Sequence, residues 1–207
     1  MKKCFIILTL VFSILLQSCQ KDADLQGITT GETSPNNKID LTGMWKFVNA
    51  HAKTIATNES VESGSTIKTV TTSDYTTENN TGTVVFNGQN MSYDSLSYSI
   101  NTIAYVTTYE NGNQIDTASI PIQAAFPVMK GESAYTAIGS DSLYFQGGGS
   151  MFAGGSQPAK PAGVKIKREQ DKLYFTQRVA ETNATTDQGL TVKSTQEAVI
   201  ITTFQKL

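Results

Sequence analysis

Apolar and polar residues alternate along short segments between residues 39 and 207, and no long segment repeats apolar residues at a helical period. Alternation with a period of two is the pattern of a strand that buries one face. Turn signals such as Asn87-Gly88 and Asn111-Gly112 separate the segments. The pattern predicts strands over residues 44–50, 66–72, 82–86, 89–98, 103–110, 114–125, 135–138, 142–146, 164–168, 172–179 and 190–204.

Short strands joined by consecutive hairpins predict an all-β fold. An antiparallel up-and-down barrel is the favoured architecture, because closing a sheet removes its exposed edges. A two-sheet β-sandwich is the alternative. The 28 threonines agree with either architecture, since threonine favours strands. No internal repeat is visible, which argues against a propeller or a solenoid.

The first residues have the features of a secretory signal. Lys2 and Lys3 form a positive start, and residues 5–16 form an apolar stretch of 12 residues that only Thr9 and Ser13 interrupt. This stretch is too short for a membrane-spanning helix, which needs roughly 20 residues. It fits the apolar part of a cleaved signal peptide, which we assign to residues 1–18.

The segment Leu16-Gln17-Ser18-Cys19 follows this stretch and resembles the lipobox of bacterial lipoproteins, in which the fourth residue is always Cys. The resemblance implies that Cys19 receives a diacylglyceryl thioether and becomes the acylated first residue of the mature chain. Gln17 departs from the small residue that is usual at its position. Two or more acyl chains anchor a protein stably to a membrane. A secreted protein with an unrelated Cys near its cleavage site is the alternative.

Residues 19–38 are predicted to be a tether, because they contain many polar residues, Gly and Pro and have no apolar period. The start of this tether, with Lys21, Asp22 and Asp24, resembles the short charged export signal of Bacteroidota surface lipoproteins. The resemblance implies transfer to the outer leaflet of the outer membrane. An ordinary linker of mixed charge is the alternative.

Charge and rare residues exclude several classes of function. Lys and Arg number 16 against 18 Asp and Glu, so no basic surplus points to nucleic acid. The chain has one His and two Cys, too few for a zinc cluster, and Cys4 would leave with the signal peptide. His51 lies just past the first predicted strand, where an exposed loop position is the expected role. We therefore expect no metal site, no disulfide and no catalytic triad.

The first predicted strand also carries a family resemblance. Gly43-Met44-Trp45 resembles the Gly-x-Trp motif that opens lipocalins and the lipocalin-like domains of bacterial lipoproteins. The resemblance implies a lipocalin-like barrel over residues 39–207 in which Trp45 fills the closed end, and a large ring suits such a space. The family stacks a late Arg on this Trp. Neither Arg168 nor Arg178 matches that position clearly, and Lys206 is a potential substitute.

Three further patterns carry hypotheses of their own. Asp94-Ser95-Leu96, Asp116-Thr117-Ala118 and Asp141-Ser142-Leu143 resemble the O-glycosylation acceptor pattern of exported Bacteroidota proteins, and local turn formation is the alternative role of such pairs. The Gly-rich residues 147–155 are a candidate lid, although a plain connection is favoured. Six tyrosines either line a cavity or fill the core, namely Tyr93, Tyr98, Tyr105, Tyr109, Tyr144 and Tyr174.

Together these features predict a non-enzymatic lipoprotein of the outer membrane, exposed at the cell surface and without a cofactor. In the first hypothesis its barrel binds a small apolar ligand, since eight-stranded barrels can hold one. In the alternative the barrel is filled, and the protein is a structural or adhesive surface module or an accessory subunit of an outer-membrane complex. The expected partner is the membrane, through the lipid anchor. No nucleic acid is expected, and the sequence names no protein partner.

The lipid anchor can be tested at Cys19. Replacing Cys19 with Ala should abolish metabolic labelling by a fatty-acid probe such as a palmitate analogue, because the thioether can no longer form. The precursor should also stay uncleaved by the lipoprotein signal peptidase. A Cys4→Ala variant is the matched control and should be labelled normally. Undiminished labelling of the Cys19→Ala variant would show that the anchor lies elsewhere.

Overall fold

The computed structural model describes residues 40–146, 161–187 and 190–207, and every regular element in these ranges is a β-strand. No helix that could span a membrane occurs in these ranges. The strands are β1 (Gly43–Glu62), β2 (Ser65–Thr76), β3 (Glu78–Phe86), β4 (Asn90–Glu110), β5 (Asn113–Ile138), β6 (Ser142–Phe145), β7 (Ala162–Glu169), β8 (Lys172–Asp187) and β9 (Leu190–Lys206).

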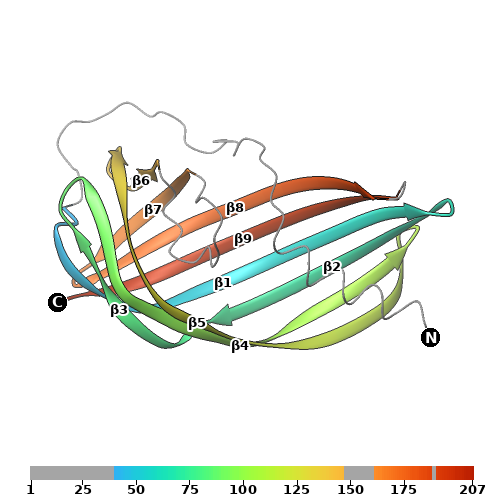
Figure 1. The fold of residues 1–207 in the computed structure, drawn as a ribbon, viewed down its shortest axis with the longest axis horizontal. Coiled ribbons are helices and arrows are strands. Elements are labelled where there is room, and N and C mark those ends of the chain that lie inside the picture. Colours follow the sequence, from blue (N-terminus) through green and yellow to red (C-terminus); the bar gives the residue numbers. More distant parts are fainter. Residues whose placement is uncertain (1–39, 147–160, 188–189) are drawn as a thin grey trace.

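All nine strands belong to one antiparallel sheet, in which most neighbours along the chain lie side by side (Figure 1). The first strand is also hydrogen-bonded to the last, with pairs running from Trp45 opposite Lys206 to Ser60 opposite Val192. This β1–β9 pairing joins the two ends of the strand order and brings the strands into a ring. The all-β, antiparallel, barrel-like fold predicted from the pattern is confirmed.

β2 and β3 share the place between β1 and β4. β3 fills it at one end, where it pairs with residues 43–46 of β1. β2 fills it further along, where it pairs with residues 51–62 of β1 and residues 105–110 of β4. β1 and β4 therefore run through the whole molecule, while each of their shared neighbours covers only part of their length.

The short strands β6 and β7 divide the sheet into two parts. They connect β5 to β8 only through residues 135–138 of β5 and residues 172–177 of β8. We call the part where β1, β3, β4, β5, β6, β7, β8 and β9 complete the circuit the ring. We call the remainder the extension, formed by residues 51–62, 65–76, 101–110, 113–125, 178–187 and 190–201. Figure 1 shows the long strands projecting beyond β6 and β7.

The hydrophobic core lies in the ring. Its ten largest fully buried side chains include four phenylalanines and the single Trp, and the ten are Trp45, Phe47, Phe86, Phe145, Phe204, Met91, Leu96, Leu143, Leu173 and Val84. Burying such side chains is the main favourable contribution to folding, at about 25 cal/mol per Å² of apolar surface. In the extension the buried side chains are small, with Ala52, Ala104 and Ser194 among them.

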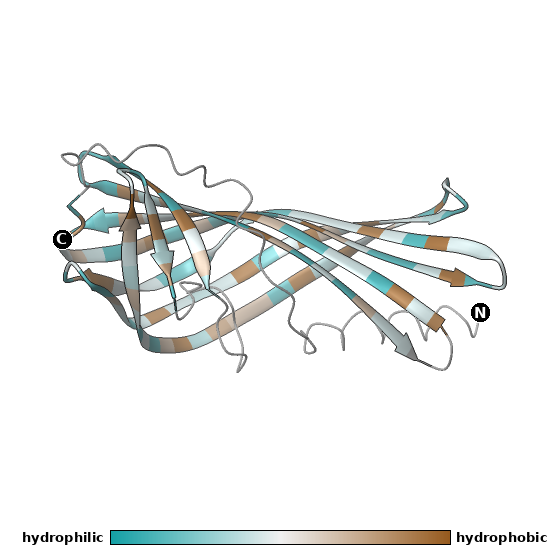
Figure 2. Cartoon of the chain, turned by 90° about the horizontal axis from the view of Figure 1, so that it is seen from above, coloured by the Kyte–Doolittle hydropathy of each residue, from teal (hydrophilic) through white to brown (hydrophobic). Residues whose placement is uncertain are grey.

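The extension is a single layer of sheet with two faces. The face that continues the ring interior, here called the inner face, carries Ala52, Tyr75 and Ile200 at one register position. The opposite, outer face carries His51, Thr76 and Ile201 at the next. Directly opposed residues of antiparallel strands point to the same side, so the register assigns every side chain to a face. Figure 2 shows apolar and polar residues mixed along these strands.

A row of β-branched residues crosses all six strands of the extension on its outer face. From β5 to β8 the opposed residues are Thr117, Thr107, Val70, Thr57, Thr195 and Thr182. Branched side chains suit a pleated, half-exposed surface, and cross-strand Thr pairs contribute roughly 0.2–1 kcal/mol each. Such rows explain how a sheet without a second described layer can hold its shape.

Several strands run further than the sequence pattern predicts. The first strand was expected to end at Ala50, but β1 continues to Glu62 because β2 and β9 pair with it on both sides. The segments 89–98 and 103–110 form one strand, β4, and the segments 114–125 and 135–138 form one strand, β5. Pro127 lies within β5, which is an edge strand in this region and so tolerates a residue that donates no backbone hydrogen bond.

The β3–β4 pair contains register shifts that require a glycine. Shifts occur between Glu78 and Thr81 and between Thr81 and Thr83 on β3. Gly82 lies there with φ +104, and a Cβ built on it would be 2.5 Å from the Cα of Leu96. Such bulges sharpen the local twist of a strand, so Gly82 allows β3 to approach β4 where the ring curves.

Replacing Gly82 with Ala should destabilise the protein strongly. The added Cβ meets the Leu96 backbone, and such overpacking typically costs about 1–3 kcal/mol. Gly64→Ala is the matched control, since Gly64 also has a left-handed φ of +85 but open space around it. Both variants incur the left-handed conformational cost of about 1–2 kcal/mol. Thermal unfolding followed by circular dichroism should show the larger loss for Gly82→Ala. Equal losses would mean that the contact with Leu96 is not limiting.

Candidate functional site

The side chain of Trp45 is completely buried at one end of the ring and is held by three groups. Its indole N–H donates a hydrogen bond of 2.8 Å to the carbonyl oxygen of Leu41. The guanidinium carbon of Arg168 lies 5.6 Å from the centre of the Trp45 ring, and the Nζ of Lys206 lies 5.5 Å from it. Cations at such distances are attracted to the face of an indole. The sequence leaves the stacking partner open, and in the structure both Arg168 and Lys206 stack on Trp45.

The residues before β1 are fixed to the same end of the ring. Arg168 Nη1 donates a hydrogen bond of 2.9 Å to the Asp40 carbonyl, and the Thr42 amide donates one of 2.9 Å to Asp40 Oδ1. The hydrogen bonds from Thr42, followed by the charges of Lys206 and Arg168, hold the pKa of Asp40 below its ordinary value. Gly43, with φ +124, then starts β1. This end of the ring is therefore plugged by Trp45 and covered by the entering chain.

Aromatic side chains fill the interior of the ring in one continuous series. Neighbouring rings in this series have centroids 4.5–6.3 Å apart, most of them tilted or edge-to-face. These are the preferred geometries of packed aromatic pairs. The series runs through Phe126, Tyr98, Phe47, Phe204, Phe175, Phe86, Tyr135 and Phe145. The described interior of the ring is thus packed with the protein's own aromatic side chains.

The six tyrosines considered as cavity-lining residues do not converge. Tyr93 and Tyr98 point into the ring, where Tyr98 stacks on Phe126 and burial raises its pKa. The other four are placed by the register on the outer side of the sheet, and Tyr105 is 59% exposed. Filling of the core explains the first two, and a solvated outer surface explains the rest.

His51 lies within β1 and not in a loop. Its Nε2 is 2.6 Å from Asp74 Oδ1, and Lys53 Nζ is 3.1 Å from Asp74 Oδ2. Hydrogen bonds from His51 and then Lys53 lower the pKa of Asp74. The Ser63-Gly64 turn sets the register that opposes Lys53 to Asp74, so this turn signal could have predicted the cluster. The three side chains are exposed, and we interpret them as a solvated cross-strand ion network.

A hollow of about 500 Å³ lies on the outer wall of the ring at the β3–β4 register shifts. Asn80, Thr81, Gly82 and Ser95 contribute to it, together with Lys46, Thr83, Asp94 and Leu207. Thr81 donates a hydrogen bond of 2.9 Å to the Ser95 carbonyl, while Asn80 Oδ1 is buried without a partner in the described chain. The hollow is wide open to solvent and mixed in polarity, so it does not resemble an apolar ligand site.

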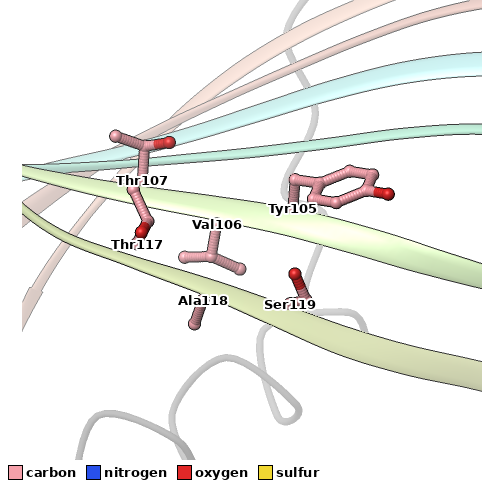
Figure 3. A pocket seen from close by; sticks show the side chains of 6 residues that line it. All are labelled: Tyr105, Val106, Thr107, Thr117, Ala118 and Ser119. Carbon is pink, nitrogen blue, oxygen red and sulfur yellow. The ribbon is translucent and has the colours of Figure 1, made fainter.

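A second, shallow hollow of about 280 Å³ lies on the β4–β5 pair of the extension (Figure 3). Three residues of each strand line it, namely Tyr105, Val106, Thr107, Thr117, Ala118 and Ser119. Their register alternates between the two faces of the sheet, so the hollow is an irregularity of a single layer. It therefore offers no enclosed space to a ligand.

The three Asp-Ser/Thr-aliphatic segments differ in accessibility. Ser95 is exposed and has a left-handed φ of +53, and Thr117 is exposed on the outer face. Ser142 is only 7% exposed, and its hydroxyl donates a hydrogen bond of 2.9 Å to Asp141 Oδ1. The aliphatic residues Leu96 and Leu143 belong to the core. The folded chain thus presents two of the three hydroxyls to solvent.

The remaining candidates lie outside the described residues. These are the lipobox Leu16, Gln17 and Ser18 with the lipidated Cys19, the sorting residues Lys21, Asp22 and Asp24, and the Gly-rich residues 147–155. In the described ranges, no group of three or more His, Cys, Asp or Glu side chains could hold a metal ion.

Comparisons with known proteins add no relative. No family model, no curated protein and no solved structure matches this chain. A function for this chain is therefore inferred from the geometry of the ring and of the extension.

Truncating Trp45 should remove much of the stability of the ring. Loss of a buried Trp side chain typically costs about 3–5 kcal/mol, so Trp45→Ala should lower the free energy of unfolding by that amount. Trp45→Phe is the control, because it keeps an aromatic ring and loses mainly the hydrogen bond to Leu41, worth about 1 kcal/mol. Denaturant titration measures both. A loss below about 1 kcal/mol for Trp45→Ala would contradict the role of Trp45 as a plug.

Proposed function

We propose that this protein is a lipid-anchored outer-membrane protein, exposed at the cell surface, whose β-sheet is a non-catalytic module that binds a partner through its surface. Lipidation at Cys19 would supply the anchor, and residues 20–38 would connect it to Asp40. The proposal includes no catalytic step, no cofactor and no nucleic acid. It corresponds to the filled-barrel hypothesis drawn from the sequence.

The observation that carries this proposal is the filled interior of the ring. A small-molecule carrier needs a concave, mostly apolar pocket of roughly 300–1,000 Å³. Here eight aromatic side chains pack against one another along the ring interior, and Trp45 closes its end. Binding of a small apolar ligand stays a prediction, and it would require these side chains to move apart.

The surroundings of Trp45 support the lipocalin-like part of the proposal. The resemblance implies a Trp at the start of the first strand with a late cation stacked on it. Arg168 from β7 and Lys206 from β9 supply two such cations. Membership of that family remains our proposal, which depends on this one local arrangement and on the ring of strands.

The extension is the natural candidate for the binding surface. It contains most of the exposed large apolar side chains of the described chain, including Ile55, Ile103, Tyr105 and Ile122. Asp40, which leads to the proposed anchor, is attached at the opposite, Trp45 end through Arg168. Each long strand continues for about ten residues beyond the ring, so the extension reaches roughly 30–35 Å from the ring.

The surface location can be tested at the proposed sorting residues. Replacing Lys21, Asp22 and Asp24 with Ala should leave fatty-acid labelling intact but protect the protein from protease added to intact cells. The parent protein should be digested under the same conditions. The control variant Glu32→Ala/Lys38→Ala removes charges from later in the tether and should behave like the parent. Digestion of both variants would make the segment a plain linker, and protection of the parent would contradict surface exposure.

A further inference from the structure

The two faces of the extension differ in charge. In its described residues, the inner face carries carboxylates but no Lys or Arg, as the register shows. These carboxylates belong to Glu62, Glu110, Asp116 and Glu181. The outer face mixes both signs, with Lys53, Lys68, Arg178 and Lys193 beside Glu59, Asp74 and Glu197. One layer of sheet thus separates an acidic face from a nearly neutral one.

The charges of the outer face compensate one another. Lys53 Nζ lies 3.1 Å from Asp74, and Glu59 is opposed by Lys68 on β2 and by Lys193 on β9. Opposite charges across strands attract each other, so most charges of the outer face are neutralised within the protein. The outer face therefore exerts little net attraction on a charged partner.

Among the described residues, no Lys or Arg of the inner face lies opposite the acidic residues of β4 and β5. Glu110 is opposed by Ile67, and Asp116 is opposed by Thr108. The Thr117 amide donates a hydrogen bond of 2.8 Å to Asp116 Oδ1. This donor is neutral, so the Asp116 carboxylate keeps its negative charge without a cation opposite it in the described sheet. The carboxylates of Glu110 and Asp116 thus lie close to the end of the β4–β5 pair that is farthest from the ring.

Apolar side chains lie next to these carboxylates on the same face. Val106, Ile120 and Ile122 occupy the following inner positions toward the ring, and Ile122 is 38% exposed. β5 is also accessible from its side, because no strand in the described chain pairs with its residues 113–134 on the edge away from β4. We call Val106, Glu110, Asp116, Ala118, Ile120 and Ile122 the acidic inner patch.

We propose that the acidic inner patch docks an extended segment of a partner protein that presents, on one of its faces, Lys or Arg residues followed by aliphatic residues. Cationic groups of the segment would face Glu110 and Asp116, and its aliphatic groups would cover Ile120 and Ile122. Complementary charges orient and select such a partner, while the apolar contacts supply affinity. This inference rests on the proposed function and names the chemistry of its partner.

The same charges argue against other occupants. Two copies of the chain meeting through this patch would bring carboxylates against carboxylates, and like charges brought together at an interface are repelled. An anionic lipid surface would be repelled for the same reason. A cationic, partly apolar polypeptide is the occupant that the patch favours.

The test uses the protein extracted from cells in a non-ionic detergent and a fluorescent peptide of about eight residues, which is long enough to span residues 116–122 of β5. The probe, here called the Lys–Ile peptide, carries two Lys and then two Ile at every second position, with Ser between them, so that the four side chains share one face. One comparison peptide has Glu in place of each Lys, and the other, the Lys–Ser peptide, has Ser in place of each Ile. Fluorescence anisotropy should show saturable binding of the Lys–Ile peptide that weakens as salt is added. The two comparison peptides should bind at least about tenfold more weakly. Absence of saturable Lys–Ile binding, or equal binding of the Lys–Ser peptide, would overturn the proposal.

Paired variants locate the contact. Glu110→Gln with Asp116→Asn removes two carboxylates from the inner face and should weaken binding about tenfold. Glu59→Gln with Glu197→Gln removes two carboxylates from the outer face of the same sheet and should leave binding unchanged. Equal weakening by both pairs would mean that the peptide responds only to net charge, and it would overturn the assignment to the inner face.

The apolar half of the patch needs its own pair. Ile120→Thr with Ile122→Thr should weaken binding, whereas Ile55→Thr with Ile103→Thr changes the outer face and should not. Unfolding temperatures of all variants separate lost binding from lost structure. A protein that fails the protease test on cells can still bind the peptide after extraction, so failure of the proposed location and failure of this inference give different results.

Discussion

Among the described residues, large side chains are fully buried only at the ring end of the sheet, and the rest of the structure depends on that end. The aromatic series from Phe126 to Phe145 fills the ring, and Trp45 closes it under Arg168 and Lys206. Every strand except β2 contributes to the circuit around this core. Since hydrophobic burial is the main favourable contribution to folding, loss of the ring core would release the extension as well.

The extension exists because its strands begin in the ring. β1 and β9 remain paired from Trp45 to Ser60. Strands that the core holds side by side in the ring therefore stay hydrogen-bonded to each other in the extension. Beyond the core, β-branched side chains and cross-strand contacts stabilise the layer, as in the row that contains Thr57 and Thr195. Pro121 and Pro127 of β5 cannot donate backbone hydrogen bonds, so they disfavour the addition of a further strand along residues 121–127.

A filled ring and a two-faced extension favour function at a surface. The interior has the geometry of a packed core, in which aromatic pairs are tilted or edge-to-face. The extension, by contrast, leaves apolar and charged groups in contact with solvent on a layer that other chains can approach. The two faces of the extension differ in charge, since the outer charges are compensated within the protein and those of the acidic inner patch have no described Lys or Arg opposite them.

The sequence by itself determined the strand content, the hairpins at Asn87-Gly88 and Asn111-Gly112, and the position of Trp45 at the start of the first strand. These features depend on alternation and turn residues, which are local properties of the chain. Only the tertiary structure decided that β1 and β4 continue through segments with weak alternation, because a strand persists wherever neighbours pair with it. It also decided which cations stack on Trp45 and which carboxylates share a face, because these depend on the register between strands that are distant in sequence.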